Sequence, residues 1–149
     1  MNTKIKFLVV DDFSGMRGHI KSLLQEIGFC HIDEAEDGNV ALHKLKIESF
    51  DFIVANWHMS SMDGLTVLQH IRANETLQEI PVLMVTTDAK KKNVLAAAQA
   101  GANGYLVGPF SAAILRDKLN IIFKNISNQS ESTSVPRKVD RQRITHHYA

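Results

Sequence analysis

An alternation between short apolar runs and amphipathic segments of helical period, repeated along most of the chain, limits the folds available to it. Apolar runs that do not alternate with polar residues indicate strands buried on both faces. Five strand–helix units in succession predict a parallel sheet between two layers of helices. The strands are expected at residues 6–10, 32–35, 52–55, 82–85 and 104–107, and the later helices at 39–47, 64–73, 91–100 and 111–126.

Individual residues refine this pattern locally. Ser14 belongs to the residue types that cap a helix and Gly28 to those that end one, so the first helix is expected between them. Trp57 directly follows the third strand, and we expect it to be a partly exposed loop aromatic.

Polar or small residues stand directly after four of the predicted strands. In open parallel sheets the functional crevice lies beyond the carboxyl ends of the strands. The residues at those ends are Asp11, Asp12, Asn56, Thr86 and Gly108. The pattern alone therefore predicts that these five positions share one site.

The composition is that of an ordinary globular protein, with 44% apolar and 22% charged residues. A formal net charge of +1 gives no reason to expect general attraction to nucleic acid or membranes. No apolar run approaches the about 20 residues that a bilayer crossing needs. A single cysteine, Cys30, cannot form an internal disulfide. We expect a cytoplasmic protein without a DNA-binding domain or membrane anchor.

The composition changes near the C-terminal end. Residues 127–134, SNQSESTS, contain no apolar side chain, which is typical of a flexible linker. A basic stretch, PRKVDRQR, covers residues 136–143. We therefore expect one domain over residues 1–126 and a flexible, basic tail over residues 127–149.

Several long motifs resemble the CheY-like receiver domains of chemotaxis response regulators. They are FLVVDDFSGMR, EAEDG, MDG, PVLMVTTDAKK and AAAQAGANGYLVGPF, and with the last helix they cover about residues 4–126. The resemblance implies a flavodoxin-like (βα)5 fold, with five parallel strands in the order 2-1-3-4-5 and helices on both faces. It implies nothing about the tail.

The resemblance also implies roles for single residues. In this family an acidic pair holds Mg²⁺, here Asp11 and Asp12, and an aspartate after the third strand accepts phosphate from a histidine kinase. A Thr or Ser contacts the phosphoryl group, here Thr86, and an aromatic residue reports the switch, here Tyr105. A lysine before a proline, here Pro109, neutralises the phosphoryl charge.

Two positions depart from the family pattern. Asn56 stands at the phosphate-accepting aspartate, and Gly108 stands at the lysine. An amide oxygen is a poor nucleophile and a weaker Mg²⁺ ligand than a carboxylate. The missing cation would otherwise stabilise the transferring oxygens. We therefore expect a non-enzymatic domain without stable phosphorylation, which requires no cofactor and binds Mg²⁺ only weakly.

These departures leave Asp11 and Asp12 without their expected cation. Like charges at close range disfavour double ionisation, so one of the two carboxyl groups is expected to titrate high. We also expect a local cation to replace the lysine. The nearest candidates in the sequence are Lys90 and His58.

The leading functional hypothesis is a phosphorylation-independent binding protein of a chemotaxis or related two-component pathway. The resemblance implies docking of flagellar-switch or chemotaxis proteins, a histidine kinase or a phosphatase through the face of helix 4, strand 5 and helix 5, at Lys91, Tyr105 and Lys118. One alternative is a cyclic-dinucleotide effector that uses the basic tail. Another is a phosphorelay receiver with a non-standard acceptor, Asp51 or Asp63.

Overall fold

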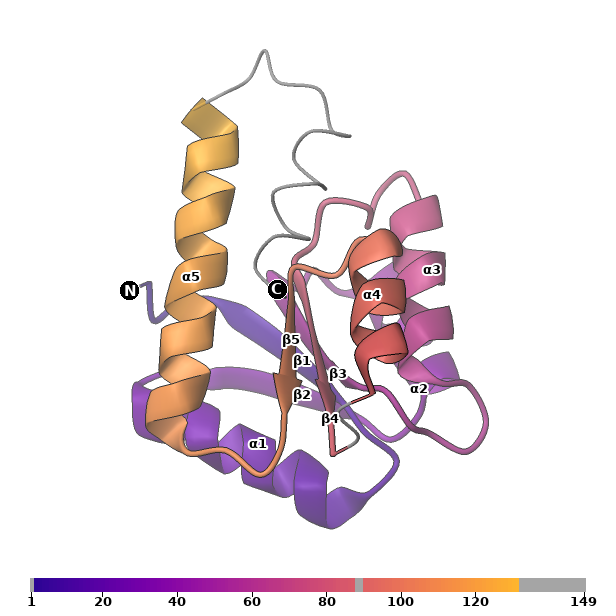
Figure 1. Cartoon of the computed structure of the whole chain (residues 1–149), viewed down its shortest axis with the longest axis horizontal. Helices are drawn as coiled ribbons and strands as arrows, with labels where there is room; N and C mark the ends of the chain where they lie inside the picture. Colours follow the sequence, from indigo (N-terminus) through magenta and orange to yellow (C-terminus); the bar gives the residue numbers. More distant parts are fainter. Residues whose placement is uncertain (1, 88–89, 132–149) are drawn as a thin grey trace.

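Strands and helices alternate along the chain in the computed structural model, which describes residues 2–87 and 90–131 (Figure 1). The elements are β1 (Lys6–Val10), α1 (Ser14–Ile27), β2 (His31–Ala35), α2 (Gly38–Ile47), β3 (Phe52–Asn56), α3 (Gly64–Ala73), β4 (Val82–Thr86), α4 (Lys91–Gln99), β5 (Gly104–Val107) and α5 (Ala112–Glu131). Each predicted strand and helix is present, and most bounds agree within a residue or two.

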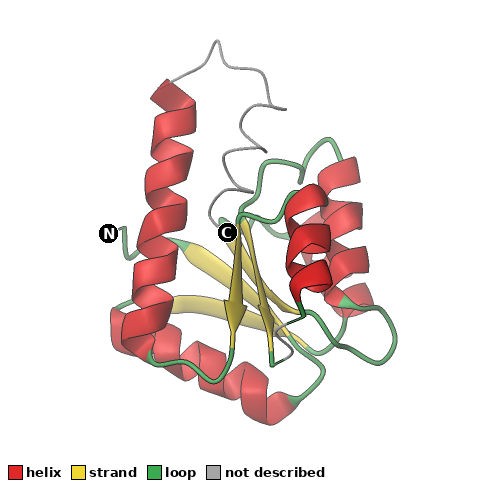
Figure 2. Ribbon diagram, viewed as in Figure 1, coloured by secondary structure: helices red, strands yellow, loops and turns green. Residues whose placement is uncertain are grey.

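The five strands form one parallel sheet in the order β2-β1-β3-β4-β5. Helices α1 and α5 cover one face of this sheet, and α2, α3 and α4 cover the other (Figures 1 and 2). The predicted flavodoxin-like fold is confirmed. All carboxyl ends of the strands meet at one edge of the sheet.

The central strands are buried on both faces. Phe7 and Val9 of β1 point into the apolar cluster beneath α1 and α5, whereas Leu8 and Val10 point into the cluster beneath α2, α3 and α4. All four side chains are fully buried. This explains the continuous apolar run in the sequence, because successive side chains of a strand face opposite sides.

The start of α1 differs from the prediction. Ser14 is the first helical residue rather than the cap, and Phe13 occupies the cap position without a side-chain hydrogen bond. The carboxylate of Asp11 accepts a hydrogen bond from the backbone N–H of Phe13 at 3.0 Å, so the side chain of Asp11 fixes the turn before the helix. Gly28 ends α1 with a φ of 127°, as predicted.

Helix α5 is longer than predicted. It runs to Glu131 rather than ending at Ile126, so the expected flexible linker is wrong for residues 127–131. The additional helical residues, 127–131, include no Gly or Pro, which favours continuation of the helix. Ile126, directly before them, packs against the apolar cluster beneath α1 and α5. Neither α5 nor another helix in the described ranges has the length and apolar character to cross a bilayer. Residues 132–149, with the basic stretch, lie outside the described residues.

Candidate functional site at the carboxyl edge of the sheet

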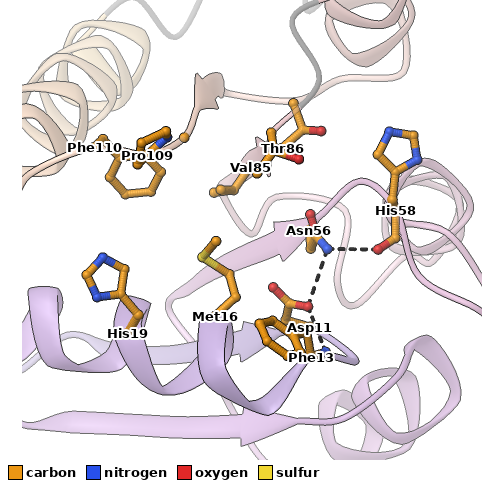
Figure 3. A pocket seen from close by; sticks show the side chains of 12 residues that line it. Asp11, Phe13, Met16, His19, Asn56, His58, Val85, Thr86, Pro109 and Phe110 are labelled. Carbon is orange, nitrogen blue, oxygen red and sulfur yellow. Dashed lines mark hydrogen bonds between the residues drawn. The ribbon is translucent and has the colours of Figure 1, made fainter.

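A pocket of about 200 Å³ lies where the central strands end (Figure 3). Four of the five strand-end positions line it: Asp11 after β1, Asn56 of β3, Thr86 of β4 and Gly108 after β5. Parallel topology brings these side chains together although more than ninety positions separate the first from the last. Asp12 is not among the lining residues.

Asp11 is the buried carboxyl group of the site, with no exposed surface. Its Oδ1 atom accepts hydrogen bonds from the backbone N–H of Phe13 at 3.0 Å and from Nδ2 of Asn56 at 3.3 Å. Its buried Oδ2 atom has no hydrogen-bond partner among the described residues. Burial raises the pKa of Asp11, and the charge of Asp12 adds a smaller increase. The pKa of one carboxyl group is therefore raised as expected, but the main cause is burial rather than the charge of the neighbouring carboxylate.

Asn56 joins two oxygen atoms that come from different loops. Its Nδ2 group donates to Oδ1 of Asp11 at 3.3 Å and to the backbone oxygen of His58 at 2.8 Å (Figure 3). An NH2 group has two N–H donors, so this amide satisfies both oxygens without a positive charge. A carboxylate at the same position has no donor and would face Asp11 with a like charge.

Asp12 connects two loops at the edge of the pocket rather than lining it. Its exposed side chain accepts a hydrogen bond from the backbone N–H of Ser60 at 2.8 Å. This bond ties the loop after β1 to the loop after β3. The two acidic residues of the pair thus have different tasks in this structure.

Arg17 is the cation whose charge lowers the pKa of Asp11, against the larger effect of burial, and the sequence analysis did not single it out. Its Nη1 donates to the backbone oxygen of Asp11 at 2.8 Å, and its Nε pairs with Glu34 at 3.1 Å. The only sequence signal is its place in the first turns of the helix that follows Asp11. His58 lines the pocket, and Lys90 is the exposed residue before α4. A role for either as the replacement cation stays a prediction.

The donor set fits a magnesium ion in part. Asp11 and Asp12 would hold it, and the unpartnered buried Oδ2 of Asp11 is an oxygen of the type that Mg²⁺ prefers. Bound there, the ion would neutralise charge on the two carboxylates. The described residues contain no group of three or more His, Cys, Asp and Glu that could hold a metal. The third polar group beside Asp11 is the neutral amide of Asn56, which is a weaker Mg²⁺ ligand than a carboxylate. Weakened Mg²⁺ binding therefore stays a prediction.

Gly108 leaves the pocket open on the side of β5. Its backbone N–H donates to the backbone oxygen of buried Thr86 at 2.7 Å. A Cβ atom at position 108 would meet only ordinary contacts, the nearest at 3.6 Å from a ring carbon of Phe110. The backbone therefore has room for a longer residue, and the glycine is not required by close packing.

Trp57 and Tyr105 pack against each other inside the molecule. Their rings meet edge to face, with centroids 6.1 Å apart. The prediction of a partly exposed Trp57 is wrong, because its side chain is only 7% exposed. Its backbone N–H donates to the backbone oxygen of Val85, which extends the pairing of β3 with β4 and turns the ring into the core. Tyr105 is 6% exposed and belongs to the apolar cluster beneath α2, α3 and α4.

The face formed by α4, β5 and α5 carries exposed apolar side chains and a lysine. Lys118 lies one turn after Ile114 on α5, and burial lowers the pKa of its amino group. Lys91 is the first residue of α4, and its side chain lies outside the described part of the chain. The exposed apolar side chains of this face are Leu95, Val107, Ile114 and Ile121.

Neither alternative acceptor lies in the pocket. Asp51 precedes β3, at the opposite edge of the sheet, and accepts a hydrogen bond from the backbone N–H of Lys6 at 2.9 Å. Asp63 caps α3 by accepting hydrogen bonds from the backbone and the hydroxyl group of Thr66 at 2.9 and 2.8 Å. Both carboxylates have structural roles.

Comparison with known proteins gives close relatives over the same range. Chemotaxis protein CheY-3 of Vibrio cholerae is 49% identical over 126 residues, which cover 85% of this chain and 97% of the relative. Chemotaxis protein CheY of Pseudomonas aeruginosa is 48% identical over 123 residues, which cover 83% and 99%.

Solved structures show the same architecture. CheY4 of Vibrio cholerae matches with a TM-score of 0.74 and 30% identity, over 80% of this chain and 98% of that chain. The receiver domain of a sensor histidine kinase of Pseudomonas aeruginosa, solved with a magnesium ion coordinated in its active-site cleft, matches with a TM-score of 0.71 and 27% identity, over 80% and 98%. The sequence pattern of the response regulator receiver domain matches residues 7–120. The chain therefore belongs to the response regulator receiver domain family.

Proposed function

We propose that this chain is a CheY-like response regulator that binds its partner without being phosphorylated. The observation that carries this proposal is the amide of Asn56, which donates from one nitrogen to Asp11 and to the backbone oxygen of His58. A neutral hydrogen-bonding group thus stands where the family places its nucleophile. The relatives named as chemotaxis proteins support a place in the same kind of pathway.

Two functional groups that phosphotransfer requires are missing from this pocket. Formation of an acyl phosphate requires a carboxylate oxygen that attacks phosphorus in line, and Asn56 has an amide oxygen instead. A cation near the transferring oxygens lowers the barrier, and Gly108 supplies none. Because the nucleophile and the cation are both missing, we infer that the whole phosphate switch has been lost.

The partner-binding surface in this proposal is the face of α4, β5 and α5. It combines exposed Leu95, Val107 and Ile114 with Lys118, a mixture of apolar contact area and positive charge. An acidic, amphipathic segment of a chemotaxis or flagellar-switch protein, a histidine kinase or a phosphatase would complement it. A ligand that binds one conformation better shifts the equilibrium toward that conformation, so regulation does not need phosphate.

No observation favours the two alternative functions. The basic stretch expected to bind a cyclic dinucleotide lies outside the described residues. The carboxylates of Asp51 and Asp63 are engaged away from the pocket.

Treatment with a phosphodonor tests the proposal. The full-length protein, its Asn56→Asp/Gly108→Lys double variant and a CheY relative as positive control are incubated with Mg²⁺ and acetyl phosphate, and intact masses are measured. We expect the relative and the double variant to gain about 80 Da, the mass of one phosphoryl group, and the wild type to stay unmodified. A phosphoryl adduct on the wild type would refute the proposal.

Binding to the partner is the second arm of the test. Calorimetry with a purified flagellar-switch or chemotaxis-kinase component is carried out with and without acetyl phosphate. We expect the same dissociation constant in both conditions. An affinity that rises with the phosphodonor for the wild type would contradict phosphorylation-independent binding.

A further inference from the structure

The walls of the pocket are mainly apolar. Phe13 and Met16 lie on one side, and Pro109 and Phe110 lie on the other (Figure 3). The side that Gly108 contributes carries no side chain, and the pocket has a volume of about 200 Å³. Such walls favour a ligand with methylene groups.

One buried carboxyl group in the pocket lacks part of its hydrogen bonding. The Oδ1 atom of Asp11 has two hydrogen bonds, but its Oδ2 atom has no partner among the described residues and is closed to solvent. In Figure 3 this second oxygen points away from Asn56, toward the side of Met16. A buried acceptor without a donor costs free energy, and a charged one costs more.

Two donors next to Asp11, on Arg17 and Asn56, are engaged with other atoms. The guanidinium of Arg17 donates to the backbone oxygen of Asp11 and pairs with Glu34, which also pairs with Lys21 at 3.5 Å. The amide of Asn56 uses its nitrogen on Oδ1 of Asp11 and on His58. A ligand that brings its own N–H donors and a positive charge would satisfy the remaining oxygen. An anion would instead meet the carboxylate of Asp11.

We propose that this pocket binds a primary alkylammonium group, with its N–H donors on Oδ2 of Asp11 and its methylene groups between Phe13, Met16 and Phe110. The inference rests on the proposed loss of phosphotransfer, because a phosphoryl group and its metal would compete for the same space. An ammonium group is compact and has three donors, and the aromatic walls add a favourable cation–π contribution. Phe13 lines the pocket and is 65% exposed, so its ring can turn to admit a ligand while disturbing little of the core.

Titration with n-butylammonium tests the binding site. The ¹⁵N-labelled full-length protein is titrated in magnesium-free buffer at constant ionic strength, and amide shifts are followed. We expect saturable shifts at the Gly108 amide and the Asn56 side chain, with a dissociation constant in about the millimolar range for so small a ligand. n-Butanol, which has the same chain without the charge, is expected to bind at least about tenfold more weakly.

Three variants separate the charge from the shape of the pocket. Asp11→Asn is expected to weaken n-butylammonium binding by at least about tenfold while its spectrum stays that of a folded protein. Gly108→Lys and Gly108→Met both fill the open side and are expected to abolish binding. The lysine variant alone is expected to raise the melting temperature, because only lysine adds a positive charge to the pocket that Gly108 and Asp11 both line.

Several outcomes would overturn the inference. These are an absence of saturable shifts, equal binding to the wild type and Asp11→Asn, equal binding of n-butanol, or shifts with Mg²⁺ but none with n-butylammonium. A phosphoryl adduct on the wild type would instead refute the proposed function, whereas missing amine binding without an adduct refutes only this inference.

The source of the ammonium group is resolved by two further probes. Cadaverine represents a diffusible amine, and a short peptide with one central lysine represents the side chain of a partner protein. Tighter binding of cadaverine supports a small-molecule ligand, and tighter binding of the peptide supports a lysine inserted by a partner. Failure of both to shift the Gly108 amide contradicts the proposed ligand class.

Discussion

At the scale of single residues, position 56 shows how one functional group changes a site. Exchange of a carboxylate oxygen for an NH2 group removes a nucleophile and a charge, and it adds donors for Asp11 and the backbone oxygen of His58. The sequence predicted that these strand-end residues would meet, because parallel topology determines it. It could not predict Arg17 as the charge next to Asp11, because that contact depends on the orientation of a long side chain on α1.

The titration of Asp11 gives a prediction at this scale. Burial raises its pKa, so the folded state binds more protons than the unfolded state from about pH 4 up to the raised pKa. Stability contributed by this group is therefore lost as the pH rises through that window. We expect Asp11→Asn to be more stable than the wild type at neutral pH, because it has no buried charge, and to lose this advantage below about pH 4.

Urea unfolding of both proteins across this pH range measures the difference directly. Other titrating groups are common to both proteins and cancel in the difference. A constant difference at all pH values, or a wild type that is more stable at neutral pH, would show that the Asp11 carboxylate is not destabilised by burial.

At the scale of elements, the start of α3 depends on the glycine of the MDG motif. A Cβ atom at Gly64 would collide with the backbone oxygen of Asn56 and lie 2.7 Å from the end of Met84. We expect Gly64→Ala to push α3 away from β3 and to destabilise the fold by about 1–3 kcal/mol. Gly18→Ala in α1 is the matched control, because nothing lies within 4 Å of its Cβ position.

The control is expected to change stability in the opposite direction. Alanine in place of a glycine inside a helix stabilises it by up to about 1 kcal/mol. Thermal unfolding of the two variants beside the wild type gives both signs. Equal destabilisation by both substitutions would contradict a specific close approach at Gly64.

Helix caps give a second prediction for the elements. Asp63 accepts two hydrogen bonds at the start of α3, whereas Ser14 makes no cap bond at the start of α1. We expect Asp63→Ala to cost about 1 kcal/mol and Ser14→Ala to stay within about 0.5 kcal/mol of the wild type. Chemical denaturation measures both changes in the free energy of unfolding. A larger loss of stability for Ser14→Ala would show that Ser14 does cap α1.

Helix ends were harder to predict than strand positions for a physical reason. A strand is marked by an apolar run between polar residues, and four buried side chains in β1 leave little freedom in its bounds. The cap of α1 is decided by the carboxylate of Asp11, which binds Phe13 from outside the helix. The end of α5 depends on packing of Ile126, so a polar composition alone did not reveal it.

At the scale of the whole molecule, the proposed partner-binding face shares no residue with the pocket, because Leu95, Val107, Ile114 and Lys118 are not among the lining residues. We expect Ile114→Glu, on α5, to weaken partner binding by at least about tenfold, because it places an acidic group in an apolar contact. Ile47→Glu on α2 is the matched control, since its side chain is also exposed but lies on the other side of the sheet.

The free energy of unfolding of both variants is expected to stay within about 0.5 kcal/mol of the wild-type value, because the two isoleucines are largely exposed. Calorimetry with the flagellar-switch or chemotaxis component measures the affinities. Equal weakening by both substitutions, or by neither, would show that the partner does not use the face of α4, β5 and α5.

The hydrogen bonds of Asn56 have a consequence for timing. A phosphorylated regulator carries a signal that decays as its acyl phosphate is hydrolysed, so its output follows the recent activity of a kinase. The amide of Asn56 is part of the covalent structure of the protein, so no hydrolysis reaction ends its effect. On the proposed function, the strength of the output would scale with the number of copies of the protein, and its duration would be set by synthesis, dilution and proteolysis.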